Sequence, residues 1–208
     1  MNVKLIQQTP RPIETISQIA SICYDSNPKD PMKLVEHLYK SGHHSVFEHI
    51  YFTFKIENIS RACSHQLVRH RMCSFTQRSQ RYCSETEQMA IVPKHISESN
   101  PQLYDDYLQM LNGISKAYKH LHANDVPNED ARYILPNACC TELYLSCNLR
   151  ELIHIANERL CCKAQWEIRK LVQKMVALVD DDLKFMLVPK CKSGRIICNT
   201  PCIKKGGK

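Results

Sequence analysis

The stretch from Gln66 to Arg81 contains the residues best suited to binding chemistry. Four arginines, Arg69, Arg71, Arg78 and Arg81, fall within thirteen residues. Such a cluster repels itself unless something anionic lies among its members. The planar fork of donors on arginine suits phosphate oxygens and the carbonyl groups of a uracil-like ring. The spacing therefore predicts a site for an anionic ligand.

Hydroxyl and amide side chains lie between these arginines and add donors and acceptors that can read the edge of a base. They are Ser74, Thr76, Gln77, Ser79 and Gln80. The alternatives are a solvated basic face and an RNA- or DNA-binding strip. Nonspecific strips usually also use lysine, which this segment lacks, and it offers only Phe75 and Tyr82 for base stacking.

The elements that position this segment can be predicted from periodicity and end signals. We expect a strand at 2–7, a helix over 31–40 that stops at Ser41-Gly42, and a strand at 50–56. Asn58 or Ser60 is expected to cap a helix that runs to about Arg71. This helix would put Gln66 and Arg69 on one face with His70 beside them. The polar stretch that continues to Cys83 is expected to be an ordered loop.

The second half of the chain is predicted to be mainly helical, with helices over 104–121, 128–135, 149–160 and 164–187 and a strand at 141–147. In the last helix an apolar stripe predicts core or subunit packing. It consists of Ile168, Leu171, Val172, Met175, Leu178, Val179 and Met186. Helices and strands that alternate unevenly predict an α+β fold with a central, mostly antiparallel sheet flanked by long helices.

The bulk composition is that of an ordinary globular protein, with 208 residues, 43% hydrophobic, 24% charged and a net charge of +7. The N-terminus lacks the apolar run of a signal peptide and no apolar stretch could span a bilayer, so we expect a cytoplasmic protein without a membrane partner. We expect one domain over residues 1–188 and a tail over 189–208 that is rich in cysteine and lysine.

The twelve cysteines are expected to be mostly reduced. Five cysteines lie among apolar residues, and we expect about four of them to be small buried hydrophobes. They are Cys23, Cys63, Cys139, Cys140 and Cys147. In the tail, Cys191, Cys198 and Cys202 lack a CxxC pair, which favours a flexible tail with one possible disulfide over a zinc site. The histidine pairs His43-His44 and His120-His122 also lack ligands at metal spacing, so no metal site is expected.

Arg69-His70-Arg71, followed after seven residues by Ser79 and then by Gln80-Arg81-Tyr82, resembles the RHR-x7-S signature of flavin-dependent thymidylate synthases. Three other blocks, in the same order, are similar to that family. They are Gly42 to His49 (GHHSVFEH), Ala131 to Pro136 (ARYILP), and Asn148 to His154 with Glu158-Arg159 and Ala164 to Ile168. The resemblance covers residues 2 to 187.

The resemblance implies the family's fold and its activity as a methyltransferase in dTMP biosynthesis. Such an enzyme makes dTMP from dUMP, takes the carbon from 5,10-methylenetetrahydrofolate and takes the reducing electrons from NADPH through FAD. It also implies a homotetramer with shared active sites and no nucleic-acid partner. A different flavoprotein on the same scaffold remains an alternative.

The resemblance implies a role for each matching position. Arg159 would lie against the uracil and favour its form ionised at N3, and His43 would lie close to flavin and substrate. FAD would be contacted by Ser45, Arg69, His70, Arg71, Gln77, Asn148, Leu149, Arg150 and His154. dUMP would be held by Gln66, Leu67, Val68, Arg69, Gln77, Arg78, Ser79, Gln80, Arg81, Arg132 and Arg159.

Physical reasoning agrees with several of these roles. Asn148 can cap the helix that starts at Leu149, which leaves backbone N–H groups aimed at a bound anion. The resemblance also implies that Ser79 contacts substrate rather than attacks it, and that the nearby Cys73 and Cys83 are not nucleophiles. The chain departs from the family's common pattern at Gln77, where glutamate is frequent. Glutamine removes a charge, keeps an acceptor and adds a donor.

Overall fold

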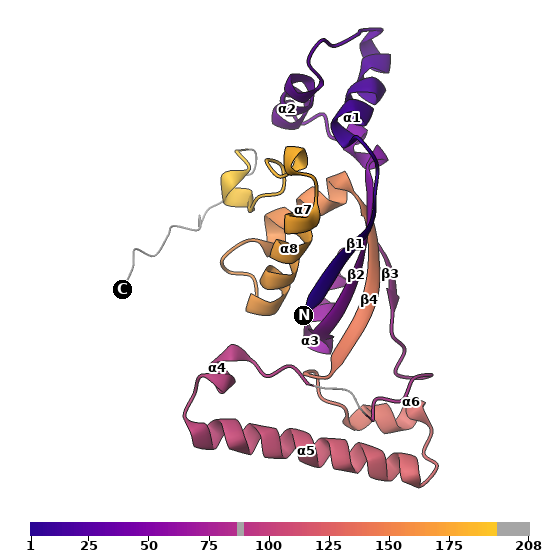
Figure 1. Ribbon diagram of the computed structural model, residues 1–208, viewed down its shortest axis with the longest axis vertical. Coiled ribbons are helices and arrows are strands. Elements are labelled where there is room, and N and C mark those ends of the chain that lie inside the picture. Colours follow the sequence, from indigo (N-terminus) through magenta and orange to yellow (C-terminus); the bar gives the residue numbers. More distant parts are fainter. Residues whose placement is uncertain (87–89, 195–208) are drawn as a thin grey trace. The chain divides into compact units, whose positions relative to one another are not determined.

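The computed structural model describes residues 1–86 and 90–194. Its four strands form one antiparallel sheet in the order β1-β2-β4-β3 (Figure 1). The strands are β1 (Asn2–Gln8), β2 (Tyr51–Ser60), β3 (Ser74–Gln77) and β4 (Cys140–Asn148). The α+β class is confirmed.

Strands β2 and β4 are neighbours whose side chains alternate between a buried and a more open face. Phe52, Phe54 and Ile56 are fully buried on β2, whereas the residues between them are not. On the open face, the hydroxyls of Thr53 and Ser146 are 2.9 Å apart and join the two strands by a hydrogen bond. Apolar alternation with β-branched and aromatic residues explains why these segments form strands.

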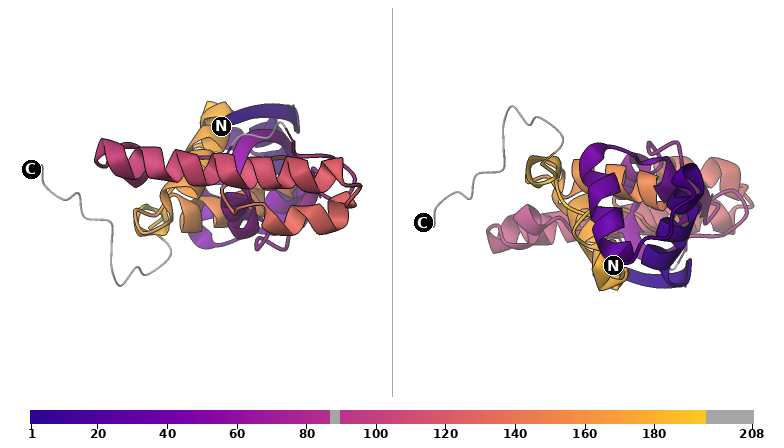
Figure 2. Two further views of the ribbon diagram at one scale, coloured as in Figure 1. Left: turned by 90° about the horizontal axis from the view of Figure 1, so that it is seen from below. Right: turned by 90° about the horizontal axis from the view of Figure 1, so that it is seen from above.

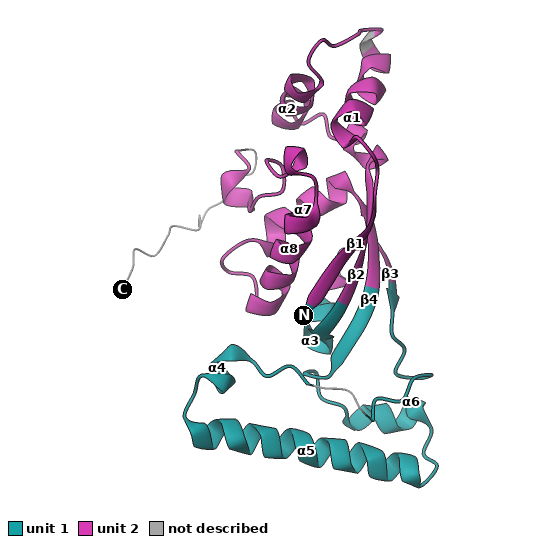
Figure 3. Cartoon of the chain, in the orientation of Figure 1, with its two compact units in different colours: residues 1, 57–66, 76–143 teal, residues 2–56, 67–75, 144–208 magenta. Residues whose placement is uncertain are grey.

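The chain divides into two compact units (Figure 3). The first contains residues 57–66 and 76–143, and the second contains residues 2–56, 67–75 and the chain from 144 onward. The first unit contains the helices α4 (Lys94–Ser97), α5 (Pro101–Ala123) and α6 (Asn128–Ala131). It also contains α3 (Arg61–Leu67) except for the last residue of that helix. The helices of the second unit are α1 (Pro12–Ser21), α2 (Pro31–Ser41), α7 (Leu149–Arg159) and α8 (Trp166–Leu178).

Five short 3-10 turns complete the described elements: η1 (Ile22–Tyr24), η2 (Ser45–His49), η3 (Arg132–Ile134), η4 (Asp181–Leu183) and η5 (Lys190–Lys192). None of the described helices combines the length and the apolar character needed to cross a membrane.

The second unit has a core made by helix pairs. Helix α1 packs against α2 (Figure 2), and α8 packs against both α7 and β1. Ile168, Leu171 and Met175 on α8 are fully buried, as the predicted apolar stripe requires, and each contributes about 1.5–3 kcal/mol by leaving water. Leu178, at the helix end, is 41% exposed and lies outside this core.

The first unit contains the long helix α5, which packs against α4 and α6 (Figure 2). Asn100 caps its start, because the side-chain oxygen accepts a hydrogen bond from the backbone N–H of Leu103 at 2.8 Å. Tyr118 is the buried residue of α5, whereas Leu103 and Met110 are 49% and 59% exposed. This helix therefore leaves much of its apolar surface uncovered within the chain.

The helix predicted to run to Arg71 ends earlier, at Leu67. Strand β2 continues to Ser60, whose hydroxyl caps α3 by accepting from the backbone N–H of Cys63 at 2.9 Å. After Leu67 the chain turns, with the N–H of His70 donating to the Leu67 carbonyl. Arg69 therefore does not share a helix face with Gln66, and the Arg69-His70-Arg71 segment lies in a turn.

Other predictions also need correction. Part of the expected loop forms the strand β3, and the last long helix ends at Leu178 rather than Leu187. The helix α1 was not predicted. Cys23 is exposed, whereas the other four cysteines expected to be buried are buried. Cys198 and Cys202 lie outside the described residues, and the boundary between residues 188 and 189 stays a prediction.

Candidate active site

The last residue of β4, Asn148, caps the start of α7. Asn148 ends the strand, and its side-chain oxygen accepts a hydrogen bond from the backbone N–H of Glu151 at 2.9 Å. The N–H of Leu149 donates to the carbonyl of Ile50 at 2.7 Å, which ties the helix to the beginning of β2. The cap predicted from the sequence is confirmed. The positive end of an eleven-residue helix thus lies at a fixed place in the second unit.

His70 joins the Arg69-His70-Arg71 turn to α7. Its Nε2 accepts a hydrogen bond from Nε of Arg159 at 3.0 Å. Its Nδ1 lies 3.4 Å from a carboxylate oxygen of Glu151, and its ring lies edge-on to that of His154 with the centroids 5.5 Å apart. Three positions singled out by the resemblance, His70, His154 and Arg159, therefore lie together in the second unit.

This environment keeps His70 neutral. Burial, the charge of Arg159 and the neighbouring His154 lower its pKa from 6.5 to about 4, although the carboxylate of Glu158 opposes the shift. Burial raises the pKa of Glu151 above its usual value, and His154 partly opposes that shift. Because His70 is neutral at neutral pH, its 3.4 Å contact with Glu151 is not an ion pair.

The same residues include a trio of potential metal ligands. Ligand atoms of His70, Glu151 and His154 lie within 4.8 Å of one another. However, the Nε2 lone pair of His70 is already used by Arg159, and the guanidinium adds a positive charge beside any cation. This donor set suits an anion or a polar ring better than a metal ion.

The outer part of this region is open to a ligand. Ser45, Arg69, Arg71, Arg150 and His154 are exposed, and so is His43. Arg150 pairs with Glu48 through Nη1 across α7 and η2, two elements that pack together. Exposed guanidinium groups and a capped helix start form a donor set that fits a phosphate-bearing ligand.

In the first unit, acidic side chains of the chain itself lie beside the arginines. Nε of Arg78 lies 3.3 and 3.4 Å from the two carboxylate oxygens of Glu85, whose side chain is 1% exposed. Arg78 also donates to the carbonyl of Ser84 at 3.2 Å. The anion expected among the arginines is thus supplied, for Arg78, by a buried glutamate.

Arg81 and Arg132 both donate to Glu129, the first to its side chain and the second to its backbone. Nε of Arg81 donates to the carboxylate of Glu129 at 2.6 Å, and Nε of Arg132 donates to the carbonyl of the same residue at 3.0 Å. The hydroxyl of Ser79 accepts from the backbone N–H of Arg81 at 3.2 Å. This serine therefore shapes the turn that presents Arg81, in keeping with a role other than attack.

Gln77 uses its amide in the interior of the first unit. Nε2 donates to the hydroxyls of Ser64 at 3.0 Å and Thr141 at 3.1 Å. A glutamate here could join the same two hydroxyls as an acceptor, so the departure from the family's pattern reverses the direction of the hydrogen bonds and keeps the connection. Beside it, Nε2 of Gln80 reaches Sγ of Cys139 at 3.8 Å.

Two of the buried thiols are poor candidates for nucleophiles. Burial, chiefly, raises the pKa of Cys139 to about 11. The pKa of Cys147 is also raised, by its contact with the thiol of Cys73 and by burial. Both thiols therefore remain protonated at neutral pH, and a thiol attacks poorly compared with a thiolate.

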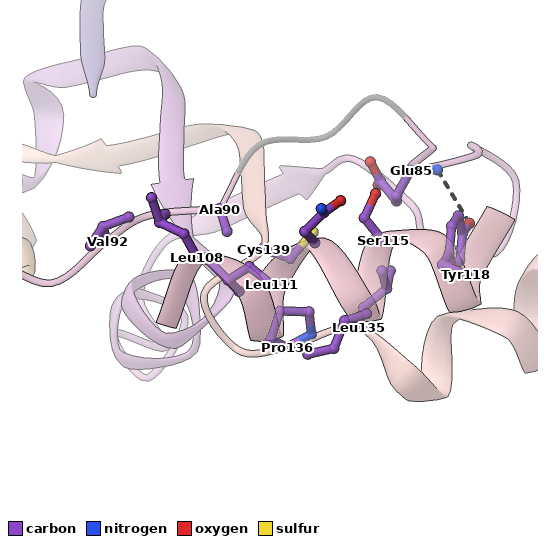
Figure 4. A pocket seen from close by; sticks show the side chains of 12 residues that line it. Glu85, Ala90, Val92, Leu108, Leu111, Ser115, Tyr118, Leu135, Pro136 and Cys139 are labelled. Carbon is purple, nitrogen blue, oxygen red and sulfur yellow. Dashed lines mark hydrogen bonds between the residues drawn. The ribbon is translucent and has the colours of Figure 1, made fainter. Parts of the chain in front are cut away.

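A pocket of about 290 Å³ lies in the first unit (Figure 4). Apolar residues of α5 and of the segment around Leu135 form most of it, and the hydroxyl of Tyr118 accepts a hydrogen bond from the N–H of Glu85 at 3.2 Å. None of the site residues predicted from the sequence lines this pocket. It is a mainly apolar pocket beside α5, and its lining includes Glu85 and Cys139, the partners of Arg78 and Gln80.

The predicted site residues thus divide into one group in each unit. Gln66, Gln77 to Arg81 and Arg132 belong to the first unit, whereas Leu67 to Arg71 and the α7 residues belong to the second. Four acids that organise them were not predicted: Glu48, Glu85, Glu129 and Glu151. Two of them had a signal: Glu48 and Glu151 lie within the blocks that resemble the family, and Glu151 also follows the capping Asn148 by three residues.

Comparisons with known proteins identify the same family that the sequence motifs resemble. The family model described as thymidylate synthase complementing protein matches residues 4–183. A flavin-dependent thymidylate synthase of Geobacter sulfurreducens is 40% identical over 193 residues, covering 86% of this chain and 82% of the relative. The enzyme of Pyrococcus furiosus with the same name is 39% identical over 190 residues, covering 85% and 78%.

The fold agrees as well. A crystal structure of the flavin-dependent thymidylate synthase ThyX of Helicobacter pylori, complexed with FAD and dUMP, superposes with a TM-score of 0.74 at 22% identity. The match covers 90% of this chain and 98% of that one. Sequence and fold together place this chain in the family of flavin-dependent thymidylate synthases.

Proposed function

We propose that this protein converts dUMP to dTMP, with 5,10-methylenetetrahydrofolate as the carbon donor and NADPH as the reductant. The observation that carries the proposal is the hydrogen bond from Arg159 to His70, which joins two of the family's blocks across 89 residues. Family membership supplies the reaction, and this contact supports a working arrangement of the residues that the reaction needs.

FAD is proposed to bind the second unit through Ser45, Arg69, His70, Arg71, Asn148, Leu149, Arg150 and His154. When bound, it supplies the reducing electrons. The exposed arginines and the capped start of α7 are suited to its pyrophosphate. Gln77 is also proposed to contact FAD, and its amide oxygen is the atom for this contact because its amide nitrogen donates within the first unit.

dUMP is proposed to meet Arg159 at its pyrimidine ring, with His43 nearby. A fixed guanidinium stabilises negative charge that develops on the ring, which makes carbon 5 more nucleophilic. The other proposed contacts are Gln66 to Arg69, Gln77 to Arg81, and Arg132. Among these, Arg78 serves mainly to hold Glu85, whereas Arg81 and Arg132 gather at the more exposed Glu129.

A homotetramer with shared active sites is part of the proposal. It is supported by the uncovered apolar residues of α5, because Leu103 is 49% and Met110 59% exposed. Covering such side chains with another copy would remove apolar area from water. Light scattering of the purified protein should give about four times the mass of the 24.1 kDa chain.

The experiment that tests the function is tritium release from dUMP labelled at carbon 5. We expect a yellow protein whose flavin spectrum is bleached by NADPH, and tritium release that requires FAD and methylenetetrahydrofolate. A colourless protein that binds no added FAD and releases no tritium would rule out the proposal. Tight, strongly salt-dependent binding of RNA or DNA by such a protein would favour the nucleic-acid alternative.

A further inference from the structure

A chain of three side chains in the second unit runs from a buried carboxylate to a guanidinium. Glu151 faces Nδ1 of His70 at 3.4 Å, and Nε of Arg159 donates to Nε2 at 3.0 Å. The two α7 residues are eight positions apart, about 12 Å along the helix axis. The imidazole of His70, 5% exposed, spans this gap between two long side chains.

The direction of the hydrogen bonds follows from the donors present. A guanidinium carries only N–H donors, so Nε2 of His70 must offer its lone pair to Arg159. A neutral imidazole has one proton, which then sits on Nδ1 and faces the carboxylate of Glu151. In the other tautomer an N–H would point at the Arg159 N–H, and a lone pair would point at the carboxylate. Both contacts would be repulsive.

The position of Glu151 in the helix does not by itself explain its burial. Its backbone N–H, not its side chain, takes part in the Asn148 cap. The side chain is only 10% exposed, and burying a carboxylate is costly unless it serves a partner. Two histidines lie within reach, the Nδ1 side of the buried His70 at 3.4 Å and the exposed His154 on the same helix.

We propose that Glu151 is a positioning residue that, together with Arg159, favours the Nδ1–H tautomer of His70 and holds the ring in its orientation against Arg159. This inference rests on the proposed function, in which Arg159 acts on the pyrimidine of dUMP. Glu151 touches neither substrate nor flavin in this scheme. Its effect is to keep a neutral acceptor, rather than a competing donor, against the guanidinium.

The first test observes the tautomer directly in the full-length protein labelled with 15N-histidine, saturated with FAD at pH 7. His70, assigned by comparison with His70→Asn, should show a protonated Nδ1 and an unprotonated Nε2. A protonated Nε2, or a charged ring, in the wild-type protein would overturn the proposal, whatever any variant does.

The second test uses a graded pair at residue 151. Glu151→Gln keeps an oxygen that can accept from Nδ1, so the tautomer and tritium release should remain close to wild type. Glu151→Leu removes one of the two contacts that favour Nδ1–H and leaves only that of Arg159. The Nε2–H form should therefore become detectable, and turnover should fall about 10- to 100-fold, the range for loss of a group that orients a functional histidine. FAD content and assembly mass are measured in parallel.

Glu158→Gln is the matched control, since it removes one negative charge from the same helix at an exposed site that pairs with Lys190. Little change is expected in its tautomer or rate. Equal losses in Glu158→Gln and Glu151→Leu would overturn the positioning role, as would wild-type turnover in a Glu151→Leu protein whose tautomer has changed. If the wild-type protein releases no tritium, the proposed function fails instead, while the tautomer measurement still decides whether Glu151 sets the state of His70.

Discussion

The paired arginines of the first unit differ from Arg159 of the second in the kind of partner that holds them. In the first unit, Arg78 and Arg81 pair with carboxylates, Glu85 and Glu129. In the second, Arg150 likewise pairs with Glu48, but Nε of Arg159 donates to the neutral ring of His70. A carboxylate cancels the charge of a guanidinium, whereas a neutral acceptor orients it and leaves the charge in place. The second arrangement suits an arginine that must act on developing negative charge.

The strongest test of this contrast replaces Arg159 by lysine. Lysine keeps the charge but loses the Nε donor that meets His70, so tritium release should fall about 10²- to 10³-fold, as for loss of one preorganised donor. FAD should remain bound. Arg169→Lys on α8, where the arginine bonds the carbonyl of Cys162, is the control. Simultaneous loss of FAD and turnover would contradict the role assigned to Arg159.

The next test removes the acid from the buried pair of the first unit. Glu85→Ala leaves the Arg78 guanidinium, 28% exposed, without its main partner and should lower the free energy of unfolding by about 2 kcal/mol. Urea unfolding followed by circular dichroism measures the change. A stable variant that no longer binds dUMP would show that this pair, too, serves the ligand, and the contrast between the units would fail.

A third test uses pH to examine the neutrality of His70. The pKa of its ring is about 4 in the folded protein and about 6.5 when unfolded, so the unfolded state binds more protons between these values. Stability should therefore decrease as the pH is lowered from 6.5 to 4, with a contribution from His70 on the order of 1 kcal/mol. Arg159, His154, Glu158 and Glu151 are the charged or titratable groups around the ring.

Urea midpoints at pH 7, 5.5 and 4.5 measure this contribution as the difference between wild type and His70→Asn. The variant should have the shallower pH dependence. His37→Asn, on the exposed surface of α2, is the control and should keep the wild-type slope. Parallel curves for wild type and His70→Asn would mean that the ring is not held neutral.

The smallest effect is expected at the exposed pair of Arg81 and Glu129. Their side chains are 56% and 49% exposed, and exposed pairs contribute about 0–1 kcal/mol. Glu129→Ala should therefore change the urea midpoint little, in contrast to Glu85→Ala. A large loss of stability here would remove the distinction between a buried and an exposed pair within the first unit.

Local signals were enough to predict the frame of the site. The strand predicted at 141–147 and the helix predicted at 149–160 are each within one residue of β4 and α7, because side-chain alternation and the Asn148 cap are local. The helix predicted up to Arg71 stops at Leu67, and the turn that follows lets His70 contact Arg159 and Glu151, which are distant in sequence. Such tertiary partners override helix propensity and leave no periodic trace.

The same limit applies to the site. The Arg69-His70-Arg71 segment and Ser79 were identifiable from spacing, and the family resemblance they supported is confirmed. The pairing of Arg78 with Glu85 was not predicted, because a single glutamate in a polar stretch looks like any surface acid. Only the fold shows that its side chain is buried.

Strands β2 and β4 lead into α3 and α7 without a single intervening residue. One residue inserted at the junction of Asn148 and Leu149 would turn all of α7 by about 100° about its axis. Glu151 and Arg159 would then both point away from His70, whatever their identities. Substitutions at these junctions should thus be tolerated far better than insertions or deletions. The number of residues between the family's blocks therefore helps to determine the geometry of the active site.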